Sequence, residues 1–135
     1  MDGRANACPS PSKHASPVTI EQRLVAWRLL LSLTLSVAVV MALLPAPPAL
    51  PIGGIGDKWA HALTFATLTL LAGLAYPETP PNRIGERLSF LGALIEIFQS
   101  IPALNRDCDI LDWLADTAAI IVVLTVIAFL RCARR

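Results

Sequence analysis

The sequence predicts an all-α, polytopic membrane protein: a four-helix transmembrane bundle with both termini on the cytoplasmic side. Hydrophobic residues make up 55% of the 135 residues and charged residues only 16%, well away from the averages of soluble proteins. Long apolar segments alternate with loops rich in proline or glycine, and basic residues gather in alternate loops. The net charge of +1 gives no basic face for a polyanion, so nucleic acid is not an expected partner.

The chain divides into a tail and one membrane domain. Residues 1–19 carry proline, serine and scattered charges without apolar periodicity and are expected to be disordered, whereas 20–135 form the domain. The first helix, about 24–44, is long enough to cross a hydrocarbon core, and Arg28 and Trp27 suit the interface. A cleaved signal peptide is the competing interpretation, but the prolines that follow the helix would block processing.

The remaining helices are expected at about 57–76, 88–101 and 110–130. Four prolines and three glycines make 45–56 a turning loop, and 77–87 is a polar, proline-rich loop. The third helix has 14 residues and would span only about 21 Å, so either its ends extend or the next loop dips inward. The fourth is long enough to cross the membrane.

Orientation follows from the positive-inside rule. With the N-terminus inside, only Lys58 and Arg106 lie outside. Nine basic residues then fall on cytoplasmic segments: Arg4, Lys13, Arg23, Arg28, Arg83, Arg87, Arg131, Arg134 and Arg135. We therefore expect a multi-pass protein of the inner or plasma membrane, with membrane lipids as its first partners.

Polar residues converge on the outer half of the predicted bundle. An ionisable side chain in hydrocarbon is costly, so these residues are expected to face the bundle interior or a wet cavity. Helical spacing gives each of the second, third and fourth helices one polar face at a similar depth. The set comprises Asp57, Lys58, His61, Glu96, Gln99, Arg106, Asp107, Asp109, Asp112 and Asp116.

Glu96 is the most deeply placed charge of this set. It is expected either to be protonated or to pair with His61, Lys58 or Arg106. The planar guanidinium of Arg106 suits a phosphate or carboxylate, or it holds Glu96 and Asp112. A purely stabilising salt-bridge network remains open. Neither a pair of spaced histidines nor a cysteine cluster supports zinc, so neither metal nor cofactor is expected. A divalent cation held by His61, Glu96 and Asp112 or Asp116 remains an open alternative.

The outer acids also have simpler interpretations. Asp57 suits an N-cap or first-turn position of the second helix, and Asp109 suits the cap of the fourth. Lys58 and Trp59 are typical interfacial anchors. Asp107 is expected to be solvated.

The segments DKWAHALTFATLTLL and EIFQSIPALNRDCDILDWLAD together resemble the VanZ-like family of small membrane proteins. The positions that carry the resemblance are Asp57, Lys58, His61, Phe65, Glu96, Gln99, Arg106 and Asp112. The resemblance spans about residues 57–120 and implies a polytopic fold with a polar pocket. Two positions depart from the family pattern: Asp116 replaces the usual Asn, and Ala119 replaces the usual Gly.

The family is named after a protein associated with teicoplanin resistance, so the resemblance implies a link to the cell envelope and to glycopeptide resistance, but no reaction. We expect the outward pocket to bind a lipid headgroup or a cell-envelope precursor. The expected ligand-binding residues are Asp57, Lys58, His61, Glu96, Gln99, Arg106, Asp112 and Asp116. An alternative is a membrane-embedded enzyme acting on a lipid-linked envelope substrate, with His61 or Glu96 as the catalytic base. A proton-coupled carrier is a third interpretation, which acids confined to one half disfavour.

Overall fold

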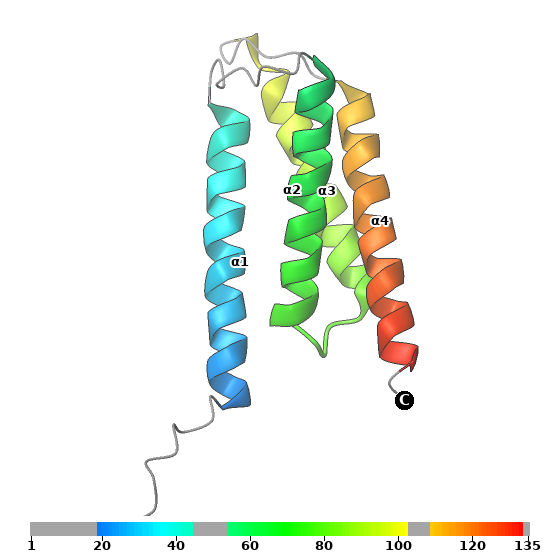
Figure 1. Ribbon diagram of the computed structural model, residues 1–135. Coiled ribbons are helices and arrows are strands. Elements are labelled where there is room, and N and C mark those ends of the chain that lie inside the picture. Colours follow the sequence, from blue (N-terminus) through cyan, green and yellow to red (C-terminus); the bar gives the residue numbers. More distant parts are fainter. Residues whose placement is uncertain (1–18, 45–53, 103–108, 134–135) are drawn as a thin grey trace, which may run out of the picture.

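The computed structural model describes residues 19–44, 54–102 and 109–133, with side chains from residue 59 onward in the second range. Four helices occupy nearly all of this part of the chain, which contains no strand: α1 (Ile20–Leu43), α2 (Gly54–Ala75), α3 (Pro81–Gln99) and α4 (Ile110–Ala133). They lie side by side and alternate in direction (Figure 1). The predicted all-α class is confirmed.

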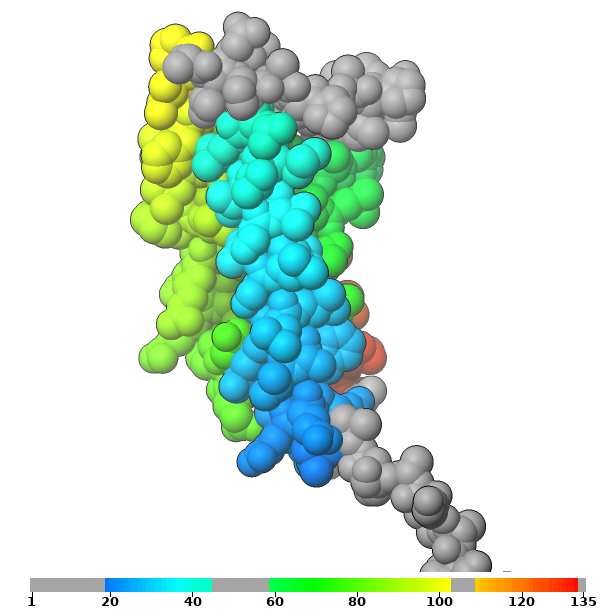
Figure 2. All heavy atoms as spheres, turned by 90° about the vertical axis from the view of Figure 1, so that its left-hand side faces the viewer, coloured from blue at the N-terminus to red at the C-terminus, as the bar shows by residue number. Residues whose placement is uncertain are grey.

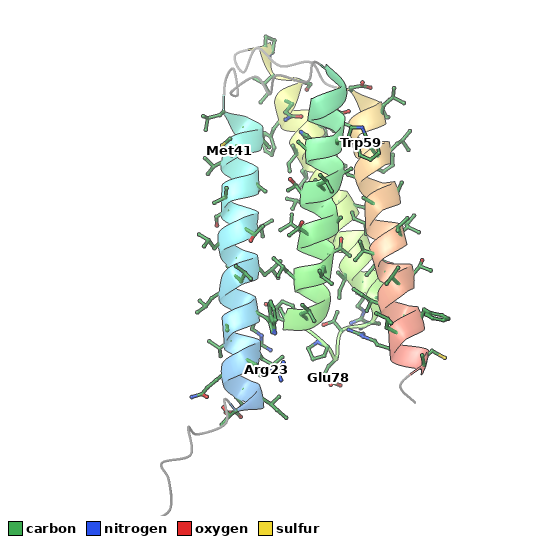
Figure 3. All side chains as sticks on the ribbon, viewed as in Figure 1. Arg23, Met41, Trp59 and Glu78 are labelled. Atoms are coloured by element: carbon green, nitrogen blue, oxygen red, sulfur yellow. The ribbon has the colours of Figure 1, made fainter. Side chains whose placement is uncertain are left out.

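Alternating directions give the bundle two chemically different ends. At one end α1 and α3 begin while α2 and α4 finish, and we call it the arginine end. Every arginine with a described side chain lies within the helical turns nearest this end: Arg23, Arg28, Arg83, Arg87 and Arg131. The opposite end, where α2 and α4 begin, we call the acidic end. Figure 3 shows Arg23 and Glu78 near the first end and Met41 and Trp59 near the second.

Helix α1 begins four residues before its predicted start because a capping box fixes its first turn. The Thr19 hydroxyl accepts a hydrogen bond from the backbone N–H of Gln22 at 3.3 Å, and the Gln22 side chain accepts one from the backbone N–H of Thr19 at 3.0 Å. These two bonds satisfy donors that would otherwise have no partner in the first turn. Residues 1–18 of the predicted tail lie outside the described residues.

The predicted start of α3 was wrong. The segment 77–87 was expected to be a loop, but the helix begins at Pro81, so α3 has 19 residues and is about 28 Å long. Proline suits the first helical position because its fixed φ fits the helix and its missing N–H needs no partner there. The turn joining α2 and α3 is therefore short and ends at Pro80. The sequence predicted that either the ends of the third helix extend or the next loop dips inward. The structure shows that the helix is extended at its N-terminal end.

Helix α2 likewise begins within the predicted loop, at Gly54 rather than at residue 57. Glycine lowers helix stability, but packing of the apolar segment that follows overrides that preference. Asp57 is consequently in the first turn of α2 and not at its N-cap. Its side chain and that of Lys58 lie outside the described residues.

The hydrophobic core lies between α2, α3 and α4. Helix α2 packs most extensively against α4, and α3 also packs against α4. The buried core residues are Phe65, Leu68, Ala72, Ile84, Leu88, Ile95 and Ile120. The exterior is apolar as well, since large hydrophobic side chains are exposed along all four helices.

Helix α1 is the peripheral helix of the bundle and has no buried residue. Figure 2 shows it lying over one face of the other helices. Leu31, Leu35, Ala38 and Ala42 are partly buried where α1 meets the core. Helices α1 and α4 are both long and apolar enough to cross a membrane, and α2 contains a shorter apolar segment, Trp59–Ala75.

Two arginines donate hydrogen bonds to backbone carbonyls at the C-terminal end of α2. The last carbonyls of a helix lack partners within it. Arg131 of α4 donates to the Gly73 carbonyl at 3.1 Å, and Arg28 of α1 donates to the Ala75 carbonyl at 3.4 Å while lying over the Tyr76 ring. Positive charge at a helix C-terminus is also favourable electrostatically. The three helices are thus joined by polar contacts at the arginine end.

Candidate functional site

Buried polar side chains gather near the acidic end of the bundle. Glu96 and Gln99 come from the last turns of α3, and Asp112 and Asp116 come from the first two turns of α4; their exposures are 6%, 2%, 9% and 1%. His61 of α2 joins them through Asp116. We call these five residues the polar cluster. Such burial is unusual because an acidic residue is almost never fully buried without partners.

The central contact of the polar cluster links α2 to α4. His61 Nδ1 lies 3.7 Å from Asp116 Oδ2, and the two side chains are 12% and 2% exposed. The sequence predicted that His61 and Asp116 lie in one group of converging polar residues, but it did not predict that they pair with each other. The structure therefore gives Asp116 a specific partner on a different helix.

The second oxygen of Asp116 has a different environment. Among the side-chain nitrogen and oxygen atoms of the described residues, Asp116 Oδ1 is the buried one that has no hydrogen-bond partner. An unpaired polar atom in the interior loses its hydration without compensation. This oxygen therefore has unused capacity to accept a hydrogen bond.

Glu96 is held at the junction of α3 and α4. Its Oε2 accepts a hydrogen bond from the backbone N–H of Asp109 at 3.1 Å. The Asp109 carboxylate in turn accepts one from the backbone N–H of Leu111 at 2.9 Å, which confirms the predicted role of Asp109 as the cap of the fourth helix. Glu96 thus fixes the residue at which α4 begins.

Gln99 connects α3 to the peripheral helix. Its side-chain amide donates to the Ala42 carbonyl in the last turn of α1 at 3.0 Å. The same contact satisfies a carbonyl that α1 itself leaves without a partner. Gln99 was predicted as a ligand-binding residue, and the geometry gives it a role in packing.

Two features beside the polar cluster were missed by sequence reasoning. Trp113 donates from its indole N–H to the Ser89 carbonyl at 3.1 Å, and the Ser89 and Thr117 hydroxyls are hydrogen-bonded at 3.0 Å. Both hydrogen bonds join α3 to α4. Spacing along the sequence does not say which side chains of two different helices meet, so neither of these two hydrogen bonds could be predicted.

Gly92 allows α3 to approach the Asp116 carboxylate closely. A methyl group placed on Gly92 would lie 3.4 Å from Phe65 Cζ, 3.5 Å from Trp113 Cδ1 and 3.7 Å from Asp116 Oδ2. All three distances are ordinary van der Waals contacts. The side of the carboxylate facing α3 therefore has room for about one methyl group.

Four predicted positions cannot be located with the others. Arg106 and Asp107 belong to the segment 103–108, outside the described residues, and the side chains of Asp57 and Lys58 are likewise not described. The structure thus brings together His61, Glu96, Gln99, Asp112 and Asp116 near one end. Comparisons with protein-family models, curated proteins and solved structures found no match to this chain. The VanZ-like resemblance accordingly rests on the sequence motif alone.

Proposed function

We propose that the chain crosses the inner or plasma membrane four times, with both termini in the cytoplasm and the acidic end outside. Helices α1 and α4 are long and apolar enough to span, and α2 and α3 pack alongside α4. Helices that pack lengthwise share one depth, and α2 and α3, at about 33 and 28 Å, approach the thickness of a hydrocarbon core. The arginine end matches the positive-inside rule.

The turn between α2 and α3 provides the test of this topology. Glu78 is exposed in that turn (Figure 3). In a variant whose native cysteines are replaced by serine, Glu78→Cys should resist a membrane-impermeant maleimide in intact cells and react after permeabilisation. A chain retaining only Cys108 should react in intact cells. Labelling of Glu78→Cys from outside would mean that α2 and α3 do not cross.

For the polar cluster we propose binding of a lipid headgroup or another cell-envelope component. The observation that carries this proposal is the burial of four polar side chains at one end of a bundle whose exterior is apolar. Buried polar networks cost stability unless they are fully satisfied, so an arrangement of this kind favours a functional role. In the proposed site Arg106 holds an anionic group, and Glu96 and Asp112 orient it.

The VanZ-like resemblance extends the same proposal to antibiotic susceptibility. A protein that binds an envelope precursor would alter the availability of that precursor to a glycopeptide. The corresponding test is the teicoplanin susceptibility of cells with and without the chain, at equal growth rate. Equal susceptibility would remove the link to resistance and leave the binding proposal intact.

Native mass spectrometry tests binding directly. The detergent-purified wild type should retain a discrete envelope-derived molecule that Arg106→Ala loses. Thr125→Val is the matched control: the Thr125 hydroxyl is exposed on α4, bonds to the Ile121 carbonyl and lies outside the polar cluster. Retention of the molecule by Arg106→Ala at a normal membrane level would contradict the assigned role of Arg106.

One observation favours an enzyme acting on a lipid-linked envelope substrate as the second candidate. The carboxylate of Asp116 beside His61 Nδ1 is the arrangement by which a general base is oriented. No nucleophile-elbow or activated-cysteine pattern occurs in the sequence, so a water molecule would have to attack. Under this proposal His61→Gln abolishes turnover of a lipid-linked substrate while the molecule detected by mass spectrometry stays bound.

A further inference from the structure

The guanidinium of Arg28 is held in one orientation at the arginine end of the bundle. Its Nε donates to the Ala75 carbonyl at 3.4 Å, and its Cζ lies 5.1 Å from the centre of the Tyr76 ring. Both contacts tie α1 to the C-terminal end of α2. Within the described part of the chain, no hydrogen bond reaches Nη1 or Nη2 of Arg28. The edge of the guanidinium formed by these two nitrogens therefore keeps its N–H donors.

The depth of Arg28 follows from the two residues that it contacts. Helix α2 is about 33 Å long, close to the thickness of a hydrocarbon core, so its last residue, Ala75, lies near the boundary between hydrocarbon and headgroups. Tyr76 is 43% exposed beside it, as is typical of a tyrosine at this boundary. In the proposed membrane arrangement, the open edge of Arg28 is thus at the depth of lipid phosphates.

The charge around Arg28 favours an anionic ligand. None of the residues three or four positions from Arg28 on α1 is acidic. The described side chains of the arginine end comprise five arginines against three acids, Glu21, Glu78 and Glu86. A guanidinium edge with two parallel N–H donors matches two oxygens of one phosphate. Basic side chains at the cytoplasmic side of a membrane also attract anionic lipids.

The surface next to Arg28 suits the apolar part of a lipid. Leu29 and Leu33 of α1 and Leu70 and Leu74 of α2 are all exposed. They lie in the turns next to Arg28 and to the end of α2, toward the middle of the bundle. A lipid whose phosphate is held by Arg28 can place its acyl chains against such side chains. A soluble phosphate has no apolar part to contact them.

We propose that Arg28 binds the phosphate of an anionic phospholipid, such as phosphatidylglycerol, at the arginine end of the bundle. Nη1 and Nη2 donate to two phosphate oxygens, while Nε remains on the Ala75 carbonyl. Phosphatidylcholine has the same phosphate, but its ammonium cancels the charge, so it binds more weakly. The polar cluster lies at the opposite end, so this inference does not depend on the ligand proposed there.

Lipid titrations followed by native mass spectrometry test the inference with the full chain in detergent. Dioleoyl phosphatidylglycerol and dioleoyl phosphatidylcholine have the same acyl chains and differ in net charge. The wild type should bind phosphatidylglycerol about fivefold more tightly, and this comparison does not depend on the folding of any variant. Equal binding of the two lipids would overturn the inference. Displacement of phosphatidylglycerol by inorganic phosphate at the same concentration would overturn the assignment to a lipid.

Two variants of Arg28 and a matched control locate the site. Arg28→Gln should lower the affinity for phosphatidylglycerol about tenfold, because it removes a charge-assisted, two-pronged contact. Arg23→Gln removes the same charge from an exposed side chain of the same helix (Figure 3) and should retain most of the affinity. Equal losses in these two variants would mean that the lipid responds only to overall charge, which would overturn the assigned site.

Arg28→Lys separates the shape of the guanidinium from its charge. A lysine ammonium is a point charge and cannot hold the Ala75 carbonyl and two phosphate oxygens in one fixed plane. Arg28→Lys should therefore lose most of the preference for phosphatidylglycerol over phosphatidylcholine, with helicity by circular dichroism equal to that of wild type. Full retention of the preference in Arg28→Lys would overturn the proposed two-pronged contact.

Discussion

Adding a methyl group to Gly92 tests the packing between α3 and the rest of the bundle. Glycine inside a helix is less favourable than alanine by about 0.5–1 kcal/mol. The new methyl group would lie 3.4 Å from Phe65 Cζ and 3.5 Å from Trp113 Cδ1, and each such carbon contact contributes about 0.1–0.2 kcal/mol. Gly92→Ala should therefore raise the free energy of unfolding by about 1 kcal/mol.

Gly73 of α2 is the matched comparison because the same substitution meets a different neighbour there. A methyl group on Gly73 would lie only 2.8 Å from Ile127 Cδ1 of α4, so the isoleucine side chain must turn away. A forced rotamer costs about 0.5–1.5 kcal/mol, which offsets the gain in helix preference. Gly73→Ala should consequently give no net stabilisation, and its free energy of unfolding should lie about 1 kcal/mol below that of Gly92→Ala.

Equilibrium unfolding in mixed micelles, with helicity followed by circular dichroism, measures both variants. A gain of about 1 kcal/mol corresponds to an increase in melting temperature of roughly 2–4 °C. A loss of stability in Gly92→Ala would show that α3 lies closer to Phe65 and Trp113 than described. Equal gains in the two variants would show that the contact between α2 and α4 at Gly73 is looser than described.

Three further substitutions test separate contacts of the bundle. Asp109→Ala removes the cap of α4 and should lower the free energy of unfolding by about 1 kcal/mol, with recovery in Asp109→Asn; no difference between the two would argue against capping. Arg131→Met leaves the Gly73 carbonyl without its donor and should cost about 1–3 kcal/mol, whereas a variant as stable as wild type would mean that water replaces the guanidinium. Leu68→Ala empties a fully buried position and should cost about 2–5 kcal/mol; exposed Leu63→Ala is its control, and similar losses at the two positions would refute the assigned core.

Much of the fold follows from hydrophobic segments and their separators. The four helices lie close to their predicted ranges because each apolar run is bounded by proline, glycine or polar residues. The largest errors occur at the first residues of the helices, where the same residue types favour both a loop and the start of a helix. A proline-rich segment predicts a loop, yet Pro81 is well suited to begin a helix, and Thr19 with Gln22 extends α1 beyond its apolar run.

The convergence of polar residues was also predictable, whereas their pairing was not. Helical spacing puts Asp112 and Asp116 on one face of α4 and His61 on a face of α2. Spacing does not say which helices face one another or how far each is rotated, so the contact between His61 and Asp116 could not be derived. For the same reason the sequence could not assign Gln99 to the end of α1.

The carbonyls at the C-terminal end of α2 accept hydrogen bonds from residues that are far away in the chain. Its last carbonyls are bound by Arg28, 47 residues before Ala75, and by Arg131, 58 residues after Gly73. During synthesis the guanidinium of Arg131 emerges only after α3 and most of α4, so the Gly73 carbonyl must remain hydrated or unpaired until then. Docking of α4 therefore provides the hydrogen-bond donor for a carbonyl of α2, a helix that was synthesised much earlier. In a nascent chain that stops before Arg131, the Gly73 carbonyl still lacks this donor.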